Sequence, residues 1–226
     1  MITYFINKNM EIIDFNKKPE SEIIEPHPLL IEYINKTVEL DYQSDRWSDE
    51  FVDSGEWHYI PSSLDDNIFL LRQLNELGIL SDEVNICDCG IGLGTIMFDI
   101  FLQSKEFTNK KFTFTGIEKH TKYTNFVKEN LLTYWKDELN LIEGDILESD
   151  YSKYNLIYSY SPFNKADKLM SFYQRILETA NPETIIIGLD HYRIMNYGQD
   201  YGDLIERFKK LKVYQLNDQI VFKVTE

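Results

Sequence analysis

Three glycines at alternate positions, Gly90, Gly92 and Gly94, stand directly behind a short apolar run that ends near Asp88. Because glycine has no side chain, a turn of this composition lets a ligand lie against the main chain. A G-x-G-x-x-G spacing would indicate the pyrophosphate of a dinucleotide, but the spacing here is G-x-G-x-G. An acid in the turn disfavours a pyrophosphate and favours a cation or polar hydrogens. We therefore expect a ligand with an amino group or a positive charge at this turn.

Two further acids follow later apolar runs. Glu118 ends the run "FTGIE", and Asp145 stands in "LIEGDIL". An acid at the end of a second strand can accept hydrogen bonds from both hydroxyls of a ribose, as it does on the ribose of NAD.

The elements that would position these acids are strands alternating with helices. We predict strands over 84–88, 112–117, 139–142, 156–160 and 184–189, and helices over 95–103, 122–134, 166–179 and 202–210. The runs "KVYQL" and "QIVFKV" predict two closing strands joined by a tight polar turn. This order predicts an α/β fold, a doubly wound and mostly parallel sheet with an antiparallel C-terminal strand pair. In such a sheet, ligands bind outside the carboxyl ends of the strands.

The N-terminal quarter has a different pattern. Residues 1–15 alternate weakly and suggest a small hairpin, and residues 28–40 have apolar residues at helical spacing. A helix is predicted from Ser63 to Gly78, with Ser63 and Asp66 forming its capping signature. The acidic and aromatic residues 41–57 have no clear period and could form a lid, a partner-binding segment or an irregular connection. We accordingly divide the chain into an N-terminal extension, 1–58, and a ligand-binding domain, 59–226.

The composition limits the partners. The chain has 226 residues, 43% of them hydrophobic, and a net charge of −15. This length and hydrophobic content fit one large domain with an appendage. So acidic a surface repels phosphate backbones, and nucleic acid is not an expected partner. Without a signal-peptide pattern or an apolar run near ~18 residues, we expect a cytoplasmic protein with no membrane contact.

The cysteines and histidines give no metal or redox signal. Cys87 and Cys89 flank Asp88 in one predicted strand, where disulfide geometry is hard to reach, so we expect small buried side chains. The four histidines show no paired spacing, and no metal site is predicted. They are His27, His58, His120 and His191.

In this arrangement the sequence resembles the class I, seven-strand S-adenosylmethionine (SAM)-dependent methyltransferases over about residues 59–226. Their first motif is an acid followed by x-G-x-G-x-G, which Asp88 and the three glycines match position by position, with Thr95 next. The resemblance implies SAM as the cofactor and methyl transfer as the activity. It also implies that Glu118 binds the ribose and that Asp145 and Ile146 lie next to the adenine.

The residues expected to face the methyl acceptor depart from part of that family. Methylases of nucleobase or glutamine amino groups carry Asn or Asp, Pro, Pro, and Tyr or Phe after the fourth strand, where this chain has "YSPF" at 160–163. The missing acid or amide argues against amino-group methylation of DNA, RNA or glutamine. Phe163 could wall the acceptor site or pack in the core. The candidates to remove a proton from an amine acceptor are Tyr160, Asp190 and His191, and those to contact the acceptor are Ser161, Phe163 and Tyr192.

A shorter stretch, "HYIPSS", resembles the loop that folds over the methionine end of the cofactor in seven-strand protein-lysine methyltransferases. That resemblance implies cofactor contacts from Tyr59, Pro61 and Ser62, and a protein acceptor such as a lysine. A plain turn before a capped helix is the alternative.

Three functions are therefore open. The first is an active methyltransferase with a protein or small-molecule acceptor. The second is a catalytically inactive SAM-binding subunit that acts through a partner protein. The third is another reaction of SAM, or another adenosine ligand, at the same site.

Overall fold

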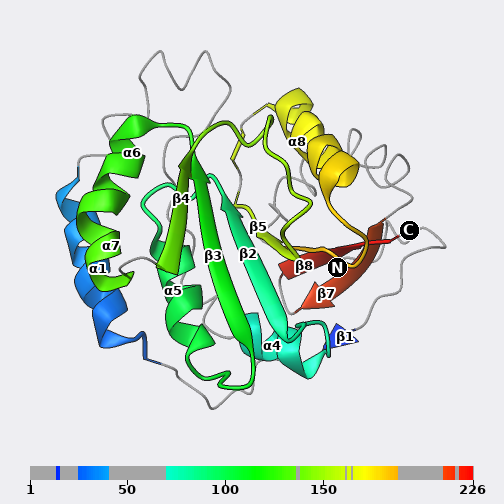
Figure 1. Ribbon diagram of the computed structural model, residues 1–226, viewed down its shortest axis with the longest axis horizontal. Helices are drawn as coiled ribbons and strands as arrows, with labels where there is room; N and C mark the ends of the chain where they lie inside the picture. The colour runs from blue at the N-terminus through cyan, green and yellow to red at the C-terminus, as the bar shows by residue number, and fades with distance from the viewer. Residues whose placement is uncertain are drawn as a thin grey trace.

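The structure is a computed structural model, shown in Figure 1. It describes residues 14–15, 25–40, 70–135, 138–160, 162–163, 165–187, 211–216 and 219–225. The segment 41–57, the predicted helix 202–210, the turn between the two last strands and most of the predicted N-terminal hairpin lie outside these residues.

One eight-stranded sheet forms the centre of the protein, with the order β1-β7-β8-β6-β5-β2-β3-β4 (Figure 1). Neighbouring strands from β6 to β4 are parallel, and β8 runs antiparallel between β6 and β7. The strands are β1 (Asp14–Phe15), β2 (Glu83–Cys89), β3 (Lys111–Glu118), β4 (Leu139–Glu143), β5 (Leu156–Tyr158), β6 (Ile185–Ile187), β7 (Leu211–Leu216) and β8 (Gln219–Val224). The predicted mostly parallel sheet with an antiparallel C-terminal pair is confirmed.

The chain reverses its direction of travel across the sheet at β2. From β2 it continues to β3 and β4 on one side, and then returns to β5 and β6 on the other side. Asp88 near the end of β2 consequently pairs with Gly116 of β3 and with Tyr158 of β5. Such a reversal leaves a crevice at the carboxyl ends of the two diverging strands, where open α/β sheets bind ligands.

The two faces of the sheet have separate cores, because alternate strand residues point to opposite faces. Val84 and Ile86 pack with α1, α4, α5, η2 and α7, whereas Cys87 and Cys89 pack with α8. Figure 1 shows α8 on one side of the view and α1, α6 and α7 together on the other. The helices are α1 (Pro28–Glu39), α4 (Leu70–Glu76), α5 (Thr95–Ser104), α6 (Thr121–Phe126), α7 (Leu132–Trp135) and α8 (Ala166–Thr179), and η2 (Val127–Leu131) is π-helical.

Three details differ from the sequence prediction. Asp14–Phe15 pairs in parallel with β7 and adds an eighth strand at the edge of the sheet, so these two residues belong to the main sheet. The helix predicted over 122–134 contains the π-helical turn η2. The strand predicted to reach residue 160 ends at Tyr158, and the amide of Ser159 makes one further hydrogen bond to the carbonyl of Ile187 in β6, at 3.0 Å. Among the described residues, no helix is long and apolar enough to span a membrane.

Candidate ligand site at the carboxyl edge of the sheet

Backbone hydrogen bonds join the loops after β2, β3 and β4 into one assembly. The amides of Gly90 and Ile91 both donate to the carbonyl of Ile117, at 2.9 and 3.0 Å. The amide of Gly144 donates to the carbonyl of Glu118 at 2.9 Å. Both neighbouring loops are therefore attached to the end of β3, next to the point where the chain reverses.

The three glycines of the loop after β2 all have positive φ, at 80° for Gly90, 54° for Gly92 and 77° for Gly94. Among the described residues, a Cβ at Gly90 would meet only Pro162, at an ordinary contact distance of 3.7 Å, whereas a Cβ at Gly94 would lie 2.6 Å from the Leu131 side chain. The first glycine thus keeps space open in front of the loop, and the third allows η2 to pack against it. Gly94 also precedes Thr95, the buried first residue of α5.

Asp88 is 4% exposed and pairs with Gly116 of β3. Glu118 stands two residues after Gly116, so the side chains of Asp88 and Glu118 lie on the same face of the sheet. Burial raises the pKa of Asp88 to about 8, and the charge of Glu118 adds to the rise. Burying two acids next to each other is unfavourable for folding unless hydrogen-bond donors or a positive charge compensate them.

Glu118 is 5% exposed and accepts three backbone hydrogen bonds. The amide of Gly92 donates to Oε2, and those of Lys119 and His120 donate to Oε1, each at 2.9 Å. Burial raises the pKa of Glu118, and these hydrogen bonds oppose the rise. The bond from Gly92 ties the glycine loop directly to this carboxylate.

Asp145 follows β4 and is half-buried. Its Oδ1 accepts from the amide of Leu147 at 2.8 Å, and its Oδ2 lies 3.5 Å from the ammonium of Lys119. The next residue, Ile146, is buried, and its carbonyl accepts from the Tyr151 hydroxyl at 2.6 Å. The fold thus brings Asp88, Glu118 and Asp145, predicted from three separate motifs, to one edge of the sheet.

The residues predicted to face the acceptor are described only in part. Tyr160, beyond the end of β5, is 44% exposed. Phe163 is 3% exposed and packs edge-on against Phe172 of α8, with ring centroids 6.2 Å apart. The ammonium of Lys168 also lies over its ring, 5.6 Å from the centroid. The other candidates lie outside the described residues: Tyr59, Pro61, Ser62, Ser161, Asp190, His191 and Tyr192.

Cys87 and Cys89 are buried and unbridged, with their Sγ atoms 3.8 Å apart. Burial raises the pKa of the Cys87 thiol well above its usual value, which suits a neutral packing side chain. In the described part of the chain, no group of three or more His, Cys, Asp or Glu residues could hold a metal ion.

Sequence reasoning missed one contact to the glycine loop. The hydroxyl of Tyr33, in α1, donates to the carbonyl of Leu93, between the second and third glycines. The signal for it was present, because a tyrosine on the apolar face of a helix needs a partner for its hydroxyl. The sequence could not reveal which acceptor it finds 60 residues away.

The chain matches no protein-family profile and no curated protein sequence. Solved structures do match. A protein of Listeria monocytogenes assigned to the class I SAM-dependent methyltransferases has a TM-score of 0.57 at 11% identity, covering 75% of this chain and 64% of its own. The protein yhhF of Escherichia coli, assigned as a methyltransferase, has a TM-score of 0.51 at 12% identity, covering 76% of this chain and 95% of its own.

A third match spans more of the chain. The plantazolicin methyltransferase BpumL, whose structure contains a pentazolic desmethylPZN analogue and S-adenosylhomocysteine (SAH), has a TM-score of 0.52 at 11% identity. It covers 88% of this chain and 95% of its own. The protein therefore has the fold of the class I SAM-dependent methyltransferases. This agrees with the resemblance inferred from the loop after β2 and from the two later acids.

Proposed function

We propose that this protein binds SAM at the carboxyl edge of the sheet and transfers its methyl group to a protein or small-molecule acceptor. The observation that carries the proposal is the pair of buried carboxylates, Asp88 and Glu118, at the point where the sheet reverses, beside Gly90, which no described side chain crowds. A ligand with a cationic group and several hydroxyl or amino hydrogens would offset the cost of burying both acids.

Each part of the site fits one part of such a ligand. The space kept by Gly90 and the N-terminus of α5 receive the methionine half, with Asp88 offering its carboxylate to polar or charged hydrogens there. Glu118 receives the ribose hydroxyls, and Asp145 with Ile146 receives the adenine. Tyr59 and Pro61 contact the methionine end of the cofactor in this proposal, as the resemblance of "HYIPSS" implies.

The geometry of Glu118 adds a condition on ribose binding. A carboxylate has about four acceptor positions, and three are taken by backbone amides, two of them on Oε1. Accepting one ribose hydroxyl on each oxygen therefore requires release of one of the bonds to Oε1. We expect the Lys119–His120 turn to adjust when the ligand binds.

When bound, SAM supplies a methyl group activated for in-line displacement from sulfur. The chain then has to position the acceptor and exclude water, without a nucleophile of its own. For an amine acceptor, a base must hold or remove a proton, and Tyr160, Asp190 and His191 are the proposed groups. The net charge of −15 favours a basic protein or an amine over nucleic acid.

The first test is calorimetric titration of the protein with SAM and SAH. We expect both to bind at micromolar to sub-millimolar concentration, as is usual for enzyme ligands. No heat change and no competition up to about 1 mM would reject the proposed site.

The second test is transfer of labelled methyl from SAM in extracts of the source cell, followed by separation of proteins from small molecules. Label in either fraction identifies the acceptor class. Binding of SAM and SAH with no label in either fraction would favour the inactive, partner-dependent subunit instead.

A further inference from the structure

Tyr33 makes a direct contact between the N-terminal helix and the glycine loop. Its side chain is completely buried, at 0% exposure, and its hydroxyl donates to the carbonyl of Leu93. Leu93 stands between Gly92 and Gly94, so the acceptor is part of the turn that the proposed function assigns to the cofactor.

The surroundings of the Tyr33 ring fix the position of its hydroxyl. The ring packs edge-on against Phe98 of α5, with centroids 5.5 Å apart, and against Tyr134 of α7, at 6.1 Å. Phe126 at the end of α6 lies 6.2 Å away. A ring held on three sides has one orientation available, so the donor is placed before any ligand arrives.

The side chain of Leu93 is held by the same part of the fold. Leu93 is buried in a small cluster with Tyr123, and Leu40 and Phe126 pack against that cluster. Leu40 directly follows α1 and is its C-terminal capping residue. The N-terminal helix therefore contacts Leu93 at its carbonyl through Tyr33, and the residue after that helix, Leu40, packs against the cluster that contains the Leu93 side chain.

We infer that Tyr33 is a positioning residue for the cofactor, acting through Leu93, an inference that rests on the proposed function. Two glycines with positive φ flank Leu93, and glycine has the largest conformational freedom to lose when a turn becomes ordered. A hydrogen bond that fixes the carbonyl between them reduces the freedom lost on binding. Such preorganisation raises affinity without any contact to the ligand.

The test compares Tyr33→Phe with Tyr134→Phe. Both variants keep an aromatic ring in the same cluster and remove one hydroxyl. The Tyr134 hydroxyl donates at 2.6 Å to Glu32, an exposed residue of α1, and does not reach the loop. Both variants therefore lose one tyrosine hydroxyl, but only Tyr33→Phe loses the hydrogen bond to the carbonyl of Leu93.

The readout is SAH affinity, measured by calorimetry at a temperature where circular dichroism shows both variants folded. We expect Tyr33→Phe to weaken SAH binding about two- to tenfold, the range for one net hydrogen bond, and Tyr134→Phe to bind as the wild type does. Affinity equal to wild type in Tyr33→Phe would overturn the inference, even if its melting temperature falls.

Hydrogen exchange gives a second readout that needs no ligand. Peptides covering residues 90–95 should exchange faster in Tyr33→Phe than in Tyr134→Phe, because the loop loses its external anchor. Equal exchange in the two variants would overturn the positioning role. Failure of the wild type to bind SAH would instead reject the proposed function, so the two failures are distinguishable.

Discussion

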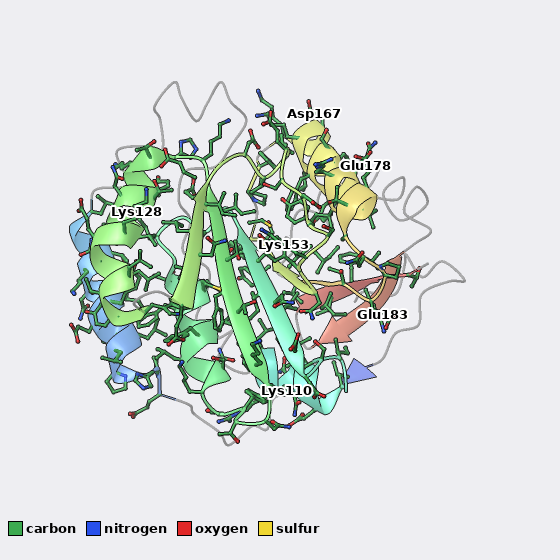
Figure 2. The ribbon with its side chains drawn as sticks, viewed as in Figure 1. Lys110, Lys128, Lys153, Asp167, Glu178 and Glu183 are labelled. Atoms are coloured by element: carbon green, nitrogen blue, oxygen red, sulfur yellow. The ribbon has the colours of Figure 1, made fainter. Side chains whose placement is uncertain are left out.

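The acids at the carboxyl edge of the sheet form two groups with opposite environments. Asp88 and Glu118 are buried, and burial raises the pKa of both. Glu143, at the end of β4, is exposed, and the hydroxyl of Thr121 lowers its pKa, helped by Lys128 at 3.6 Å. Figure 2 shows Lys128 at the periphery, on the helices beside β4.

We interpret the difference as a division between the buried acids that the proposed function assigns to the ligand and a surface acid that serves only the fold. Glu143 obtains hydroxyl and ammonium partners from the protein itself, as an ordinary surface acid does. Asp88 is held where its charge is unfavourable, and strongly perturbed acids in a crevice are typical of functional sites. If the inner acids, Asp88 and Glu118, serve a ligand and the outer acid, Glu143, does not, substitutions of the inner acids should change ligand binding and substitutions of the outer acid should not.

Glu118→Gln should damage both stability and binding. The NH2 group of the glutamine would replace one carboxylate oxygen and would face the backbone amide of Gly92 or those of Lys119 and His120. Two donors would then face each other, and a buried N–H would have no acceptor. We expect the free energy of unfolding to fall by about 1–3 kcal/mol and SAH affinity to fall more than about tenfold. Urea unfolding and calorimetry measure the two effects.

The control is Glu143→Gln in the outer group, which should leave SAH affinity unchanged. If Glu143→Gln weakens binding as much as Glu118→Gln does, the distinction between inner and outer acids is wrong.

Asp88→Asn should weaken binding and stabilise the fold. The pKa of Asp88 rises from an unfolded value near 3.8 to about 8 in the folded protein. Its contribution to stability is therefore complete below the unfolded pKa and is lost as the pH rises through about 8. We expect Asp88→Asn to melt at a higher temperature than wild type at pH ~8.5 and to bind SAH about 10- to 100-fold more weakly. A lower melting temperature at that pH would show that Asp88 is a structural acid.

The affinity of the wild type for SAH should rise with pH. If the ligand needs the ionised form of Asp88, whose pKa is about 8, Asp88 must release a proton when the ligand binds at a pH below that value. This linkage predicts an affinity gain of about tenfold from pH ~6 to pH ~7, where the amino group of SAH remains protonated. Titrations at constant ionic strength should show the gain in wild type and none in Asp88→Asn. If the affinity of the wild type for SAH does not change between these pH values, binding does not depend on the ionisation of Asp88.

Lys119→Ala should have the smallest effect. Its ammonium lies 3.5 Å from Asp145, and removing it frees Oδ2 to accept the adenine amino group. We expect SAH to bind more tightly for this reason. The gain should be no more than about fivefold, because partly exposed ion pairs contribute little free energy. Lys128→Ala, which breaks the comparable pair with Glu143, should not change binding. Weaker binding in Lys119→Ala would mean that this lysine contacts the ligand itself.

Local patterns in the sequence were enough to predict the sheet and the edge of it at which three acids meet. The apolar run before the glycines predicted residues 84–88 as a strand, and β2 spans Glu83–Cys89. Parallel strands end at a common edge, so three acids at successive strand ends had to lie near one another. The positions of Asp88, Glu118 and Asp145 follow from this rule.

Features that depend on distant parts of the chain were not predictable. The π-helical turn η2 looks like any amphipathic helix in sequence, and its Val127 and Leu131 lie against Gly94 only in the folded protein. The two residues of β1 pair with a strand that follows about 200 residues later, which no local pattern encodes. The Tyr33 hydroxyl similarly finds an acceptor that its own helix does not specify.

The end of β3 has a consequence for how mutations combine. Its Ile117 carbonyl holds the glycine loop, and its Glu118 carbonyl holds the loop that carries Asp145. Substitutions in the two loops therefore act on one shared support, although they would touch opposite halves of the proposed ligand. Their effects on stability and binding should not add, and a double-mutant cycle between the loops should give a coupling energy of about 0.5 kcal/mol or more.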